Sequence, residues 1–266
     1  MTGPDTAPPR PGGGRTLAAF SRDPLAVAFL RCFLRSYMVG AGFNSRGLQN
    51  IGFSYAMEPG LRAIHAQDPE ALKRARRRYV GIYNSHPFWA ACLVGICLSM
   101  ERLVAGDRMP PAMLKKVRTT TTYTLSAIGD SVFAGSVLIF WALASANLLA
   151  AGHDLWALVF GAALFAALQL FRGLTFYMGL KMGFRVLERL KHIGLIDWGR
   201  RIKFANALLV LLLWWQLWPV RTWWGWGLGA GGLLLAGALN RRLNVPRELL
   251  AAVVLAALVL LARMSG

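Results

Sequence analysis

Charged residues and cysteines are both scarce in this chain of 266 residues. Only 16% of the residues are charged, against about 25% in a typical soluble domain, and 56% are hydrophobic. The three cysteines are too few for a disulfide framework. Cys92 and Cys97 lie five positions apart within an apolar run, where they are expected to act as small buried hydrophobes. This composition argues against a soluble globular domain.

Recognisable catalytic and metal-binding motifs are also absent from the sequence. There is no Gly-x-Ser-x-Gly elbow, no Walker loop and no carboxylate pair at the spacing found in glycosidases. The histidines His65, His86, His153 and His192 are widely separated, without Cys or carboxylate neighbours at ligand spacing. We therefore expect no metal site, no cofactor and no catalytic residue.

Long apolar runs account for the excess of hydrophobic residues. Four of them reach the range of about 17–25 residues that a helix needs to cross about 30 Å of hydrocarbon. They are residues 125–151, 155–171, 204–220 and 222–239. A last run, 249–262, is shorter, and whether it spans stays open. The sequence predicts an all-α membrane protein with its transmembrane helical region in residues 125–266.

The formal net charge of +18 first suggests a nucleic-acid partner. The basic residues, however, gather beside the apolar runs, in clusters at 73–78, 115–118, 181–203 and 241–247. Such clusters anchor the cytoplasmic ends of membrane helices and attract anionic lipid headgroups. The expected partner of these charges is the lipid bilayer and not nucleic acid.

The first 39 residues combine a tail with an amphipathic segment. Residues 1–22 are rich in proline and glycine and lack the apolar core of a signal peptide, so a disordered tail is predicted. Asp23-Pro24 can start a helix. Residues 25–39 then place two arginines one turn apart on an otherwise apolar cylinder. This pattern predicts an amphipathic helix that lies in the membrane interface.

The rest of the region 23–124 is predicted to hold a basic helix and a re-entrant hairpin. The apolar stretch 48–66 is interrupted by glycines, Glu58 and Pro59, and Asp68-Pro69 starts a basic helix. If residues 86–100 crossed the membrane, the basic clusters on either side would face opposite compartments. Their 15 residues would also cover only about 22 Å. Residues 83–103 are therefore expected to dip in and return, with polar groups from Asn84-Ser85-His86-Pro87 at the entrance.

The later runs are predicted to form two pairs of spanning helices. The run 125–151 leads outward, a loop with His153 and Asp154 turns the chain, and 155–180 returns to the basic stretch. The second pair turns near 219–221. Six tryptophans near this turn are expected to form an aromatic belt at the outer interface. They are Trp214, Trp215, Trp218, Trp223, Trp224 and Trp226.

A few polar residues lie inside or beside the apolar runs, where they mark candidate functional positions. Asp130 or Ser131 could cap a helix over 132–149, or line a polar pathway. Arg172 could extend toward the interface, or pair inside the protein, with Asp130 as one candidate partner. Asn84 could cap the helix that starts at His86-Pro87, or serve a substrate.

These residues belong to a series of motifs that resembles the IID component of the mannose-type sugar phosphotransferase system. The series is Asn44, Gln49, Gly52-Phe53, Pro59, Asn84-Ser85-His86-Pro87-Phe88, Ile128-Gly129-Asp130-Ser131, Phe133, Gly135, Arg172, Gly179-Leu180-Lys181 and Gly183. The resemblance covers roughly residues 25–190.

The resemblance implies a membrane-embedded permease subunit. In that family, IIC and IID subunits carry a hexose across the bacterial cytoplasmic membrane, and both use re-entrant hairpins. The IIB subunit phosphorylates the sugar and is recharged through IIA from phosphoenolpyruvate, so a hetero-oligomer and no phosphorylated residue in this chain are implied. The implied residues of the sugar path or its support are Asn44, Gln49, Asn84, His86, Asp130, Ser131 and Arg172.

Several positions depart from the family pattern and keep other functions open. They are Arg46, Asn50, Glu58, Tyr123, Thr124 and Leu138. Because some lie in stretches that would line the path, a non-transporting scaffold or regulator derived from a IID subunit is an alternative. An intramembrane enzyme acting through His86 and Asp130 is a third hypothesis.

Overall fold

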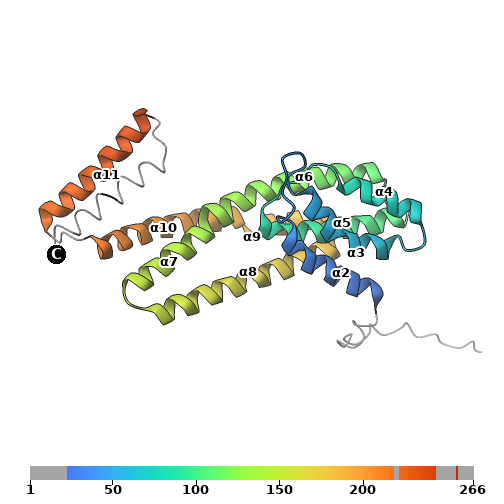
Figure 1. The fold of residues 1–266 in the computed structure, drawn as a ribbon, viewed down its shortest axis with the longest axis horizontal. Helices are drawn as coiled ribbons and strands as arrows, with labels where there is room; N and C mark the ends of the chain where they lie inside the picture. Colours follow the sequence, from blue (N-terminus) through green and yellow to red (C-terminus); the bar gives the residue numbers. More distant parts are fainter. Residues whose placement is uncertain (1–22, 219–221, 244–255, 257–266) are drawn as a thin grey trace, which may run out of the picture. The chain divides into compact units, whose positions relative to one another are not determined.

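The computed structural model describes residues 23–218, 222–243 and 256. Within these residues the regular elements are all helices, apart from two isolated β-bridges (Figure 1). The chain divides into two compact units, residues 1–138 with 162–201 and residues 139–161 with 202–266. The predicted tail, 1–22, and the predicted last run, 249–262, lie outside the described residues, Ala256 excepted.

The first unit begins with three helices whose starts are set by local signals. They are α2 (Pro24–Arg35), α3 (Asn50–Ile64) and α4 (Pro69–Tyr79), and a short 3₁₀ helix, η1 (Ser36–Met38), follows α2. The carboxylates of Asp23 and Asp68 accept hydrogen bonds from the N–H groups of Leu25 and Ala71. The two helix starts predicted at Asp-Pro are therefore confirmed.

Helix α3 is continuous, although its sequence suggested interruptions. It contains Pro59, and its glycines serve close packing instead of breaking the helix. A Cβ at Gly52 would lie 2.1 Å from the carbonyl oxygen of Val39, and one at Gly60 would lie 2.3 Å from Leu98. The glycines let α3 approach its neighbours closely.

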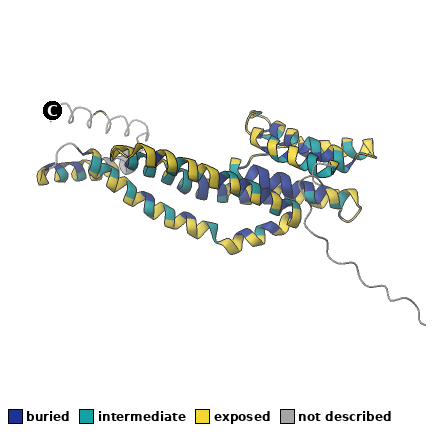
Figure 2. Ribbon diagram, turned by 90° about the horizontal axis from the view of Figure 1, so that it is seen from below, coloured by how far each residue is buried: buried dark blue, intermediate teal, exposed yellow. Residues whose placement is uncertain are grey.

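Helices α5 (Pro87–Ala105) and α6 (Pro111–Gly129) form an antiparallel pair joined by residues 106–110. At 19 residues, α5 is about 28 Å long, and it is long and apolar enough to cross a membrane. The predicted length of about 22 Å for this segment was wrong, because the helix continues past the charged Glu101. Most of α5 is buried inside its unit, as the dark blue ribbon in Figure 2 shows.

Two longer helices complete the candidate spans. Helix α6 passes into a π-helical segment, η2 (Asp130–Val137), and then into α7 (Leu138–Ala150), which gives 40 continuous helical residues. After a turn at Gly152, α8 (Asp154–Met182) follows. A 3₁₀ turn, η3 (Gly183–Arg185), joins α8 to α9 (Val186–Ile193), which ends at a left-handed Gly194. The predicted first helical pair is present.

The second unit contains α10 (Leu195–Leu217) from residue 202 onward and α11 (Trp223–Leu243). Within the residues described, neither helix combines the length and the apolar composition of a membrane span. The second spanning pair therefore stays a prediction. Asn147 on α7 donates to the carbonyl oxygen of Leu209 at 3.0 Å and accepts from Gln216 at 3.0 Å. Trp226 packs against Trp214, Trp215 and Trp218, with ring centroids 4.9–6.0 Å apart.

Candidate substrate-path site

The candidate site is built around His86, at the start of α5. Its Nδ1 atom accepts a hydrogen bond of 3.4 Å from the N–H of Phe88, so His86 is the N-cap of the helix. The alternative that Asn84 caps this helix is wrong, and Asn84 is exposed. His86 itself is buried, at 8% exposure. The backbone of Gly129 packs closely against His86, because an added Cβ at Gly129 would lie 2.4 Å from the Cβ of His86.

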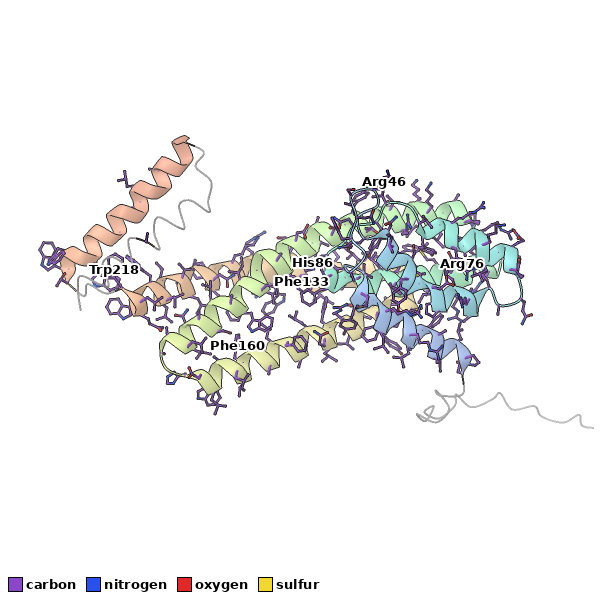
Figure 3. All side chains as sticks on the ribbon, in the orientation of Figure 1. Arg46, Arg76, His86, Phe133, Phe160 and Trp218 are labelled. Atoms are coloured by element: carbon purple, nitrogen blue, oxygen red, sulfur yellow. The ribbon has the colours of Figure 1, made fainter. Side chains whose placement is uncertain are left out.

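An aromatic cluster surrounds this histidine. The imidazole stacks on Phe133 from η2 at 5.3 Å and on Phe88 at 5.5 Å (Figure 3). Phe133 also meets the edges of Trp89 and Phe171, at 5.7 Å and 5.3 Å. Side chains from α5, η2 and α8 thus hold the imidazole in place.

Asp130 and Ser131 are the first residues of η2, and they lie beside His86. Neither of them caps a helix. The capping prediction for this pair is wrong, because α6 continues into η2 and leaves no free helix start to cap. Asp130 is exposed, and the hydroxyl of Ser136 donates to the carbonyl oxygen of Ser131 at 2.9 Å. Single π-helical turns inside α-helices are rare and occur often at functional sites. Here the turn presents Asp130 next to the capping histidine.

Asn44 and Gln49 belong to a loop that is fastened to the same region. The side-chain oxygen of Asn44 accepts from the N–H of Gly47 at 2.7 Å, and its amide donates to the carbonyl oxygen of Leu48 at 3.2 Å. Gln49 accepts from the N–H of Ser85 at 3.1 Å through its side chain. Gln49 therefore contacts the segment that carries Asn84 and His86, whereas these contacts of Asn44 lie within its own loop.

A cavity of about 150 Å³ opens next to Asn84. Its polar lining includes Tyr83, Arg118, Thr122 and Ser126. The hydroxyl group of Thr122 is buried and has no hydrogen-bond partner within the part of the chain that the structure describes. These lining residues were not predicted. The spacing of Thr119, Thr122 and Ser126, which places three hydroxyls on one face of α6, was the available signal.

Arg172 is separate from Asp130. Its guanidinium lies 3.7 Å from the ring centroid of Tyr37, and its side chain is buried at 7% exposure. No ion pair between Asp130 and Arg172 is present among the described residues, so the predicted internal partner exists but is an aromatic ring. The Tyr37 hydroxyl donates to Gln169 at 2.8 Å, which fixes the ring.

A buried carboxylate, Glu101, forms a second polar cluster that sequence reasoning missed. Glu101 is fully buried and accepts from Arg78 at 2.6 and 2.9 Å and from Tyr79 at 2.8 Å. His65 lies 3.1 Å away. Arg118 from α6 donates to the carbonyl oxygen of Arg78 at 2.8 Å. The basic clusters 73–78 and 115–118 are thereby held side by side.

Asn50 and Glu58, which depart from the family pattern, both make contacts with neighbouring segments. Asn50 donates to the carbonyl oxygen of Val80 at 2.6 Å and accepts from Asn44 at 3.0 Å. Glu58 on α3 forms ion pairs with Arg62 and with Arg76 of α4. Both residues join α3 to its surroundings. Within the described residues, no group of three His, Cys, Asp or Glu side chains could hold a metal ion.

Comparisons with known proteins agree with these motifs. Residues 26–213 match the family described as "PTS system mannose/fructose/sorbose family IID component". The "PTS system mannose-specific EIID component" of Escherichia coli K12 is 30% identical over 164 residues, which are 61% of this chain and 56% of that protein. The "Fructose permease IID component" of Bacillus subtilis is 27% identical over 154 residues, 57% of this chain and 54% of that protein. The chain therefore spans about half the length of the curated relatives it matches.

Solved structures with a similar fold are also known. One, "Structure of membrane protein", gives a TM-score of 0.52 at 27% identity and covers 72% of this chain and 69% of its own. A chain of the "CryoEM Structure of Mannose Transporter ManYZ and Microcin E492 (MceA) complex" gives a TM-score of 0.48 at 25% identity, over 74% and 70% of the two chains. Because the family match extends over well more than half of its residues, this chain belongs to the IID components of the mannose/fructose/sorbose phosphotransferase systems.

Proposed function

We propose that this chain is the IID subunit of a mannose-type sugar permease in the bacterial cytoplasmic membrane. It forms the translocation path for a hexose together with a IIC subunit, while IIA and IIB carry the phosphoryl group. The observation that carries the proposal is the family match over residues 26–213, which includes every candidate site residue from Asn44 to Arg172. In this role the chain binds and positions sugar, and it is not itself phosphorylated.

We further propose that residues 79–105 form the re-entrant element. The contact between Arg118 and Arg78 supports a position of both basic clusters on one side of the membrane, as the positive-inside rule favours for a segment that does not cross. Residues 80–86 then lead inward, and α5 returns. His86 abuts Gly129, which lies eleven residues beyond Arg118 on α6. Eleven helical residues cover about 16 Å, roughly half of the hydrocarbon thickness.

In this proposed geometry the polar residues lie where the chain turns inside the membrane. His86 and Asn84 lie at the inner end of the re-entrant element, and Asp130 faces outward beside them. A backbone that turns at mid-membrane depth has free polar groups, and it is tolerated where protein or a watery cavity satisfies them. The cavity next to Asn84, lined by the unpartnered hydroxyl of Thr122, supports a hydroxyl-bearing ligand in this place.

The same geometry favours a different position for α2. Phe33 packs on Phe176 of α8 at 5.2 Å, and Tyr37 bonds to Gln169, one turn before Arg172. Helix α2 therefore follows the spanning helix α8 toward the centre of the bilayer over its second half. The position flat in the membrane interface, which the sequence predicts for α2, is the alternative to this arrangement.

The experiment is sugar uptake by the chain reconstituted with the IIC, IIA and IIB proteins encoded in the same cell. We expect the variants His86→Ala and Asp130→Asn each to lower uptake at least tenfold, because both remove a polar group from the path. Asp154→Asn, an exposed carboxylate at the start of α8, is the matched control and should transport normally.

Assembly is measured in parallel by co-purification of the IIC subunit. Normal uptake in both site variants would refute the assignment of the path. If the wild-type protein binds IIC but transports no sugar, the permease proposal is wrong and the scaffold alternative is favoured.

A further inference from the structure

An apolar groove of about 540 Å³ runs between α2 and α8, within the first unit. Its walls are aromatic and aliphatic side chains from both helices. They are Phe29, Leu30, Phe33, Phe176, Tyr177 and Leu180. Leu30 and Tyr177 are about half exposed, so the groove is open to the outside of the unit.

One end of the groove is positively charged. Arg102 from α5 and Lys181 from α8 line it, and both are exposed. Neither makes an ion pair with any residue that the structure describes. Lys181 lies 4.9 Å from the ring centroid of Tyr177. The carboxylate at this end, Asp23, is the N-cap of α2, so two cations face a single carboxylate that is already hydrogen-bonded.

The apolar part of the groove extends from this charged end along a candidate spanning helix. The groove reaches Gly173, eight residues before Lys181, which is about 12 Å along α8. Lys181 also begins the basic stretch 181–203, the expected cytoplasmic boundary of the helix. The charged end therefore lies at headgroup level and the apolar end in the hydrocarbon.

We propose that this groove is a binding site for one anionic phospholipid. The phosphate group lies between Arg102 and Lys181, and one acyl chain follows α8 to Gly173. The occupant is a lipid because the groove has a cationic end and a long apolar wall. It therefore fits a molecule that joins an anionic group to an unbranched apolar chain. Anionic headgroups are also concentrated at the cytoplasmic surface, where each Lys or Arg adds to the attraction. The proposal does not depend on sugar transport.

The test is native mass spectrometry of the purified full chain in detergent, with added phosphatidylglycerol or phosphatidylcholine of identical acyl chains. We expect phosphatidylglycerol to be retained about 25-fold more, because each of the two cations contributes about fivefold. The double variant Arg102→Gln/Lys181→Gln should remove this preference, with about a fivefold loss for each cation. Arg46→Gln/Arg108→Gln, two exposed cations outside both the groove and the basic clusters, is the matched control and should bind as wild type.

A second variant tests the acyl-chain end. A Cβ at Gly173 meets nothing within 4 Å, so Gly173→Phe can fill the groove without displacing backbone. It should weaken retention of both lipids, while Gly173→Ala should not.

Three outcomes would overturn the proposal. They are equal retention of both lipids by the wild type, equal loss in the Arg46/Arg108 control, and photo-crosslinks from the groove that reach a IIC peptide in the assembled complex but no lipid. Circular dichroism of each variant verifies that the helices remain folded.

Discussion

Glu101 is a fully buried carboxylate within the apolar helix α5. A carboxylate in an apolar segment suggests the end of a membrane helix, yet α5 continues past it because Arg78, Tyr79 and His65 satisfy its oxygens. A buried charge is tolerated only with partners of this kind. Those partners lie 22, 23 and 36 positions away, so no local pattern revealed them.

Replacing this carboxylate should destabilise the first unit strongly. The substitution Glu101→Ala leaves Arg78 with a largely buried and uncompensated charge, which costs about 3–5 kcal/mol. In a protein of this size the melting temperature should fall by about 6–20 °C. The measurement is thermal unfolding of the purified chain in detergent.

The matched control is Glu70→Ala, because Glu70 is exposed and its ion pair with Lys73 is long, at 3.9 Å. Such a pair contributes at most about 1 kcal/mol. An equal melting temperature for wild type and Glu101→Ala would show that the buried cluster adds nothing to stability.

At the scale of elements, the packing of α5 on α8 depends on two small residues. A Cβ at Gly95 would lie 2.4 Å from the carbonyl oxygen of Phe176, and one at Gly179 would lie 2.7 Å from that of Cys92. Membrane helices associate through close backbone contact of this kind, since hydrocarbon surroundings offer no hydrophobic gain. Gly179 belongs to the motif series in the sequence, whereas Gly95 does not, and only the fold shows that the two glycines pack against the opposite helix.

We expect Gly95→Leu to separate α5 from α8. Because the obstructing atoms are backbone, the new side chain cannot be accommodated by a rotamer change, and the cost should exceed the 1–3 kcal/mol typical of overpacking. The measurement is the yield of monodisperse protein and its melting temperature. Gly173→Ala on α8 has free space and should behave as wild type, and an unchanged Gly95→Leu variant would disprove the close contact.

At the scale of the whole molecule, the main prediction is topological. The re-entrant element requires the clusters 73–78 and 115–118 to lie on one membrane face, and the contact of Arg118 with Arg78 agrees with this requirement. The three natural cysteines are fully or almost fully buried, so they will not react with a charged reagent.

Cysteines introduced at Arg76 and Lys116 should therefore be labelled from the same side of the membrane. Both positions are exposed. The measurement is labelling by a membrane-impermeant maleimide in oriented vesicles, with Asp154→Cys, at the turn before α8, as the marker for the opposite face. Labelling of positions 76 and 116 from opposite faces would exclude the re-entrant element.

The sequence predicted what depends on neighbouring residues. The starts of α2 and α4 at Asp-Pro, the turn before α8 and the apolar composition of the spans are properties of a few consecutive positions or of a whole run. The motif around His86 and Asp130 likewise indicated the family without knowledge of the fold. These features follow from helix capping and from the length of apolar segments, which tertiary contacts do not change.

The tertiary structure alone decided which polar residue meets which. It made His86 and not Asn84 the cap, gave Arg172 the ring of Tyr37 in place of Asp130, and let α5 continue beyond Glu101. It also placed the groove between α2 and α8 and the cavity beside Asn84. Partners of this kind come from helices far apart along the chain. Which of several partners a buried charge or hydroxyl meets is determined by helix packing, and a linear pattern of residues does not contain that information.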